Sequence, residues 1–141
     1  MTEAVLDANI LLRHLTGQPP ELAQQARGLL QAAERRKIRL TVTALTLAEV
    51  VFVLDRTYRW SRHKISSGLQ TLLTAGVVHV PEHHILARAL ALYHNYPRVH
   101  FADAYVAAVA LERGAALISF DGDLRVIPRL RLIATPDDLP A

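Results

Sequence analysis

The chain has 141 residues, of which 51% are hydrophobic and 21% charged, so it can bury a core, and a disordered or fibrous protein is excluded. It contains no cysteine, which excludes disulfides and thiolate metal sites and leaves oxygen or imidazole ligands for any metal. The net charge of +3 is only a weak indication of an anionic partner. Because the start lacks a basic and then apolar leader, and no uncharged run approaches the ~20 residues of a membrane span, we expect a cytoplasmic protein without membrane insertion.

Hydrophobic periodicity and chain breakers predict that strands and helices alternate along the first half of the chain. A short buried strand ends at Asp7, and a helix that starts at Pro19 and Pro20 ends in a basic run. Ser61 can cap a further helix that ends at Gly76. The expected elements are strands at 4–6, 38–43 and 77–80 and helices at 8–15, 19–37, 45–54 and 61–76. The apolar face of the second helix is expected to comprise Leu22, Ala26, Leu29, Leu30 and Ala33.

The same alternation continues in the second half, with helices expected at 82–93 and 101–113 and strands at 115–120 and 130–133. Strands that alternate with helices favour a parallel sheet covered on both faces, because each parallel crossover needs a connection of about a dozen residues. No internal repeat and no low-complexity linker interrupts the pattern. We therefore expect one three-layer α/β domain over residues 1–141, with a central parallel sheet flanked by helices and a strand order that periodicity does not give.

Four carboxylates each stand alone in an apolar segment. They are Asp7, Glu49, Asp103 and Asp121. Surface carboxylates normally occur in polar company, whereas a carboxylate buried without a partner is costly or takes up a proton. The occurrence of four such carboxylates suggests that they share one role, although any single aspartate at a strand end could be a helix cap or a turn residue.

The predicted elements offer these carboxylates a shared location. Asp7 and Asp121 follow strand ends, where open α/β sheets bind ligands, and Glu49 lies in the helix after the second strand. Asp103 begins a helix, where the macrodipole favours an anion. Facing carboxylates repel unless a divalent cation lies between them, and oxygen ligands without sulfur select Mg²⁺ or Mn²⁺. Such sites generate a hydroxide nucleophile and stabilise a phosphoryl transition state, which predicts phosphodiester hydrolysis.

Polar neighbours of these carboxylates are candidates for supporting roles. Asn9 could direct its amide toward a metal-bound water or a phosphate, and a turn or N-cap role explains it equally well. Thr46, like Thr43, could hold a metal-bound water, but helix back-bonding and strand propensity explain the two threonines as well. Asp123 could be an outer ligand or a residue of the Asp-Gly-Asp turn.

Four segments, in their order and spacing, resemble the successive acidic motifs of PIN-domain nucleases. They are Val-Leu-Asp-Ala-Asn-Ile-Leu-Leu-Arg at 5–13, Thr-Leu-Ala-Glu at 46–49, Phe-Ala-Asp-Ala at 101–104 and Ile-Ser-Phe-Asp at 118–121. The resemblance runs through nearly the whole chain, and no expected acidic position is missing. It implies a PIN-like fold and a Mg²⁺- or Mn²⁺-dependent endoribonuclease whose catalytic metal ligands are Asp7, Glu49, Asp103 and Asp121. Bacterial PIN proteins of this length are mostly VapC-type toxins of toxin-antitoxin pairs, so the similarity also implies an RNA substrate, a homodimer and a cognate antitoxin that blocks the acidic site.

Histidines and basic residues suggest further sites, each with a plainer alternative. His83 and His84 are adjacent and point in different directions, and no two histidines within one expected helix have the spacing of a helical zinc site, so we expect solvated or packed histidines. His100 could touch a substrate phosphate. The densest basic cluster consists of Arg56, Arg59, Trp60, Arg62, His63 and Lys64. In it, Tyr58 and Trp60 could stack on unpaired bases or could simply form a corner between two helices.

Other functions fit the acidic pattern less well. A receiver-type phosphotransfer domain also gathers carboxylates around Mg²⁺, but it needs a lysine at a late strand end, and the lysines here are Lys37 and Lys64. A dinucleotide-binding module needs a glycine-rich first turn, which residues 6–9 do not provide. A non-catalytic RNA-binding protein of the same fold remains an alternative, and an assay of RNA cleavage with and without Mg²⁺ separates it from a nuclease.

Overall fold

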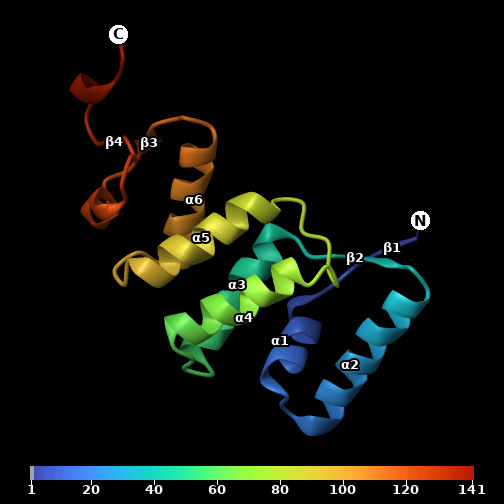
Figure 1. The fold of residues 1–141 in the computed structure, drawn as a ribbon. Coiled ribbons are helices and arrows are strands. Elements are labelled where there is room, and N and C mark those ends of the chain that lie inside the picture. The colour runs from blue at the N-terminus through green and yellow to red at the C-terminus, as the bar shows by residue number, and fades with distance from the viewer. Residues whose placement is uncertain (1) are drawn as a thin grey trace. The chain divides into compact units, whose positions relative to one another are not determined.

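The computed structural model describes residues 2–141, which form two compact units, residues 2–83 and residues 84–141. Within residues 2–141 there are six α-helices and two pairs of short parallel strands (Figure 1). The first elements in chain order are β1 (Glu3–Val5), α1 (Ala8–Thr16), α2 (Pro20–Arg35), β2 (Arg39–Thr41), α3 (Ala44–Arg56) and α4 (Arg62–Thr74). They are followed by α5 (His83–Asn95), α6 (Phe101–Glu112), β3 (Leu117–Ile118), the 3-10 helix η1 (Gly122–Val126), β4 (Leu132–Ile133) and the 3-10 helix η2 (Pro136–Asp138).

The parallel pair of β1 and β2 sets the positions from which α1 and α3 begin. Val5 lies opposite Thr41, and the backbone N–H of Leu6 donates to the carbonyl of Thr41 over 2.9 Å. Thr41 also forms an isolated parallel bridge with His79, so the strand expected at 77–80 is reduced to this bridge. β1 has the expected three residues but lies one position earlier, whereas β2 is shorter than the strand expected at 38–43, because the residues after Thr41 turn directly into the cap of α3.

Polar caps begin three of the four helices in the first unit. Asp7, Thr43 and Ser61 are the N-caps of α1, α3 and α4, and each side chain accepts a hydrogen bond from a backbone N–H of the first turn. The predicted Ser61 cap is thereby confirmed. α1 ends at Gly17, whose φ of 69° lies in the left-handed region that glycine adopts without strain. α1 packs against α2 and α3, and α3 packs against α4. The fully buried side chains include Leu11, Leu47, Leu54, Ile65 and Leu69.

The buried face of α2 differs from the expected one. Leu30 and Ala33 are buried as predicted, but Leu22 and Leu29 are 43% and 58% exposed. Ala23 is buried instead. The alanines of this helix therefore face the core, and small side chains allow α2 to approach its neighbours closely while two leucines remain at the surface.

The second unit contains two α-helices, a short parallel strand pair and two 3-10 helices. β3 and β4 pair over two residues each, which is less than the expected strands at 115–120 and 130–133. The rings of Tyr93 and Phe101 meet edge-on with their centroids 5.9 Å apart, and Arg88 forms a 3.0 Å ion pair with Glu112. These contacts connect α5 with α6.

The predicted α/β class is confirmed, because all six predicted helices are present and every strand pair is parallel. None of the helices in residues 2–141 has both the length and the apolar character needed to cross a membrane.

Candidate functional site

Asp7 is held at the point where β1 leads into α1. As the N-cap of α1, its carboxylate Oδ1 accepts a hydrogen bond from the backbone N–H of Ala8 over 2.8 Å. The amide Nδ2 of Asn9 donates to Oδ2 over 3.5 Å. Asn9 therefore contacts the predicted metal ligand and is not itself the cap, so that its turn or N-cap interpretation is wrong. Asp7 is exposed and keeps unused lone pairs on its oxygens for a further ligand.

Thr43 occupies the equivalent position after β2. It is the N-cap of α3, and its Oγ1 accepts a hydrogen bond from the backbone N–H of Thr46 over 3.1 Å. The Thr43 hydroxyl in turn donates to Oγ1 of Thr46 over 3.1 Å. Both threonines thus serve the start of α3, and neither strand propensity nor helix back-bonding accounts for them.

Glu49 lies on the solvent-exposed side of α3. The residues at positions 45, 49, 52 and 56 are all exposed and follow one another at helical spacing, so they form one stripe along the helix. We refer to Leu45, Glu49, Phe52 and Arg56 as the α3 stripe. No hydrogen bond or ion pair engages the Glu49 carboxylate within residues 2–141. Glu49 is therefore available for binding.

In the second unit, Asp103 and Asp121 lie at the starts of helical turns. Asp103 is in the first turn of α6 and is half-buried, with no hydrogen-bond or ion-pair partner among residues 2–141. Asp121 caps η1, and its Oδ1 accepts a hydrogen bond from the backbone N–H of Asp123 over 2.9 Å. The backbone N–H of Asp121 donates to Oγ of Ser119 over 3.0 Å. Asp123 is thus a turn residue, and its carboxylate lies 3.9 Å from the guanidinium of Arg98.

The expectation that isolation among apolar residues reflects burial of the carboxylates is wrong. Asp7 and Glu49 are exposed, and Asp103 and Asp121 are half-buried. Apolar neighbours in sequence do not report burial at these positions, since Val5, Ile118 and Phe120 are themselves exposed. Two of the four, Asp7 and Asp121, do form the caps that the plainer interpretation predicts.

The donor chemistry of these residues fits a hard divalent cation. Asp7 and Glu49 belong to the first unit and Asp103 and Asp121 to the second, and all four offer carboxylate oxygens. In the caps, one oxygen of each aspartate accepts from a backbone N–H, which fixes the side chain while lone pairs of the carboxylate remain for a further ligand. Within residues 2–141 no three histidine, aspartate or glutamate side chains are arranged as a ready metal cluster. The four-carboxylate metal site therefore stays a prediction.

The basic cluster seen in the sequence lies between α3 and α4. Lys64 places its Nζ 4.1 Å from the centroid of the Trp60 ring, and the edge of that ring faces Gly68, so Trp60 packs into the corner between the helices. Arg56 lies over the ring of Phe52 at 5.4 Å. The corner interpretation therefore holds for Trp60, whereas the exposed ring is that of Phe52, which no motif in the sequence singles out. The feature that could have identified Phe52 is that it is an apolar residue outside the buried face of α3.

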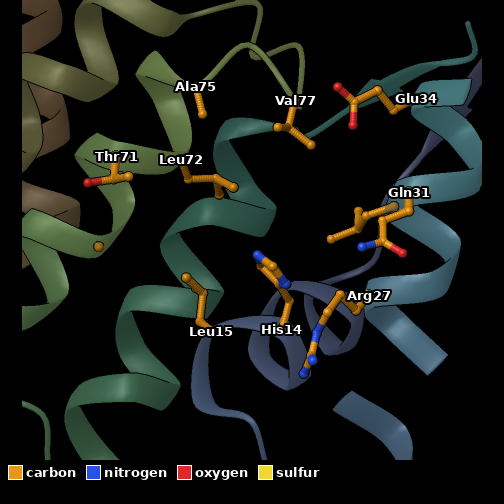
Figure 2. A pocket seen from close by; sticks show the side chains of 11 residues that line it. His14, Leu15, Arg27, Gln31, Glu34, Thr71, Leu72, Ala75 and Val77 are labelled. Carbon is orange, nitrogen blue, oxygen red and sulfur yellow. The ribbon is translucent and has the colours of Figure 1, made fainter. Parts of the chain in front are cut away.

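A cavity of about 420 Å³ lies in the first unit between α1, α2 and α4 (Figure 2). His14 of α1 and Arg27 of α2 lie side by side at its edge, with Gln31 and Glu34 further along α2. Partial burial, followed by the positive charge of Arg27, lowers the pKa of His14 from 6.5. No spacing in the sequence marks this cavity, because its walls come from three separate helices.

The PIN domain family model matches residues 4–130 of the chain. A search of curated proteins finds no match. The six helices and parallel strands agree with the three-layer fold of this family, whose members are typically nucleases that use divalent metal ions and bind RNA. Since the match covers most of the sequence, the chain belongs to the PIN domain family.

Proposed function

We propose that the chain is a Mg²⁺- or Mn²⁺-dependent endoribonuclease that hydrolyses RNA phosphodiester bonds. The observation that carries the proposal is the position of Asp7, a carboxylate fixed as a helix cap just beyond a parallel strand pair with lone pairs left for a cation. Its place in a PIN domain supports the same conclusion.

In this proposal Asp7, Glu49, Asp103 and Asp121 hold the metal and are the catalytic residues. A divalent cation bound there would acidify the attacking water and neutralise charge on the phosphate. Asn9 orients the Asp7 carboxylate through its amide. Asp123 supplies the backbone N–H that orients Asp121, and Thr46 contributes indirectly by securing the start of α3 with Thr43.

The experiment is cleavage of an end-labelled RNA by the purified chain, in chelator and after addition of Mg²⁺ or Mn²⁺. We expect chelation to abolish cleavage and the metal to restore it, and an Asp7→Asn variant purified in the same way controls for contaminating ribonuclease. Hydrolysis by water leaves a 5′-phosphate and a 3′-hydroxyl, since no side chain has to recruit the ribose 2′-hydroxyl. Full activity in excess chelator, or a 2′,3′-cyclic phosphate product, would contradict the proposal.

We further propose that this nuclease is the toxin of a type II toxin-antitoxin pair and acts in the cytoplasm as a homodimer. The resemblance to VapC-type toxins supports this role. A cognate antitoxin would block the carboxylates, for which an inserted arginine is a charge-matched, bidentate partner. We expect a small protein from the neighbouring reading frame to copurify with the chain and to suppress cleavage. A monomeric chain that is harmless when expressed and captures nothing would contradict the toxin role and leave the nuclease activity to be judged by the cleavage assay.

A further inference from the structure

We propose that the α3 stripe from Glu49 onward, with the basic residues at its end, forms a binding track for single-stranded RNA, an inference that rests on the proposed ribonuclease function. We define the basic corner as Arg56, Arg59 and Lys64, which extend from the last residue of α3 into the first turn of α4. The track would begin at Glu49 and end at this corner. All of its residues belong to the first unit, where α3 and α4 pack together (Figure 1).

The charges of the basic corner are available to an anionic ligand. Arg56, Arg59 and Lys64 are exposed, and no ion pair engages them within residues 2–141. Between residues 50 and 64 the sequence holds a single carboxylate, Asp55. Three cations that lack carboxylate partners are therefore concentrated on one short segment, which suits the phosphates of a nucleic acid.

Phe52 distinguishes this surface from an ordinary solvated basic patch. The ring is 60% exposed although Arg56 covers part of it at 5.4 Å, and an aromatic ring beside a guanidinium is suited to stacking on an unpaired base. Bases in a duplex are already stacked on each other, so this feature favours single-stranded RNA. Trp60, in contrast, is half-buried and is in contact with Lys64.

The track leads to a residue of the proposed metal site. Glu49 and Arg56 are seven residues apart on one helix, which corresponds to about 10 Å along its axis. At ~3.4 Å per stacked nucleotide, this length spans about three nucleotides. A phosphate at Glu49 would therefore place the strand's neighbouring nucleotides over Phe52 and onto the basic corner.

The decisive experiment measures RNA binding in chelator, so that its outcome does not depend on cleavage. The probe is a short fluorescent single-stranded RNA of mixed sequence, titrated by anisotropy at several salt concentrations. We expect Arg56→Gln/Lys64→Gln to weaken binding and to reduce the slope of log K against log[salt] by roughly 0.7 for each phosphate that the variant no longer neutralises. We expect Phe52→Ala to weaken binding by about tenfold, with little change in salt slope.

Arg35→Gln/Arg36→Gln is the matched control, because it removes two exposed cations from the same unit at the end of α2. We expect it to bind RNA like the wild type. Equal weakening by both double variants would overturn the track, since general electrostatics would then explain binding. The track would also be overturned if the wild type did not bind RNA. It would be overturned, too, if Phe52→Ala bound RNA normally but changed its oligomeric state, since Phe52 would then belong to a contact between copies of the chain. If the wild-type chain bound RNA but cleaved none, and the track variants lost binding, the track would be upheld and the nuclease function rejected.

Discussion

Asp7 and Thr43 are equivalent residues: each is the N-cap of the helix that follows one of two paired strands. Val5 lies opposite Thr41 in the parallel register, and each cap follows its strand by two residues. Asp7 accepts a backbone hydrogen bond over 2.8 Å and Thr43 accepts one over 3.1 Å. The two side chains thus share a structural role, but Asp7 alone adds a negative charge and a second oxygen. A comparison of their variants therefore separates helix capping from metal binding.

Asp7→Asn is expected to abolish RNA cleavage while the fold is retained. Asparagine caps helices about as well as aspartate, so the free energy of unfolding should change by less than about 1 kcal/mol. The amide is a poor ligand for the cation. Loss of a residue that only orients a metal ligand lowers activity about 10- to 100-fold, so loss of the ligand itself should lower the cleavage rate at least ~100-fold. Cleavage rates and urea unfolding curves of the same preparations check both parts.

Thr43→Ala, at the equivalent position, is expected to lower stability and to leave cleavage intact, the reverse of Asp7→Asn. Without the cap, the free energy of unfolding should fall by about 1 kcal/mol, while the cleavage rate of the folded protein stays close to that of the wild type. If Asp7→Asn were to cleave RNA normally and Asp7→Ala were merely less stable, Asp7 would be a cap and nothing more.

Asp121→Asn is expected to lose cleavage while it retains the η1 turn. The asparagine side chain still offers an oxygen to the backbone N–H of Asp123, so the unfolding curve should stay close to that of the wild type. Asp123→Asn is the comparison. Its ion pair with Arg98 is long, and the arginine side chain is 86% exposed, so we expect a small effect on stability and a milder loss of cleavage. Equal cleavage by Asp121→Asn and the wild type would remove Asp121 from the site.

Local signals predicted the helices well because helix boundaries depend on nearby residues. Ser61 satisfies a backbone N–H three residues ahead, and Gly17 supplies the left-handed residue that ends α1. The face that a helix buries depends instead on its neighbours. The exposed leucines of α2 show this, since Leu22 and Leu29 fit the helical period but Ala23 is the residue that faces the core.

The candidate site was predictable as a set of residues but not as an arrangement. The positions of Asp7 and Asp121 at strand ends followed from short-range patterns, and the structure places both as caps. Their exposure did not follow, because the sequence shows apolar neighbours without showing which way those neighbours point. Phe52 was missed for the same reason, since its exposure depends on how α3 packs in the folded unit.

Mg²⁺ or Mn²⁺ is expected to raise the melting temperature of the wild type, and Glu49→Gln should reduce this rise. A ligand that binds only the folded state stabilises it by RT ln(1 + [L]/Kd), about 2.7 kcal/mol at a hundredfold excess over Kd. Glu49 is exposed and without a partner in residues 2–141, so its replacement should leave the melting temperature in chelator unchanged. Melting curves with and without metal measure both quantities.

Asp55→Asn is the control for this metal response, since Asp55 is an exposed carboxylate on the same helix. It should respond to metal as the wild type does. Glu49→Gln and Asp103→Asn should both respond weakly, and a full response in either variant would show that its carboxylate does not bind the cation.

His14 is expected to make the first unit less stable as the pH falls through about 6.5. Its pKa in the folded chain is lowered from 6.5, first by partial burial and then by the charge of Arg27, so the unfolded chain binds the proton more readily. The neutral imidazole's contribution to stability is therefore fully present above pH 6.5 and is lost as the pH decreases toward the folded pKa. His14 lines an open cavity and remains partly exposed, so solvent screening keeps the effect small.

We expect the fall in melting temperature between about pH 7.5 and about pH 5.5 to be smaller in His14→Gln than in the wild type. Arg27→Gln should give an intermediate fall, because it removes the charge but leaves the partial burial of the imidazole. An unchanged pH dependence in His14→Gln would show that other groups, and not His14, set the acid sensitivity of the fold.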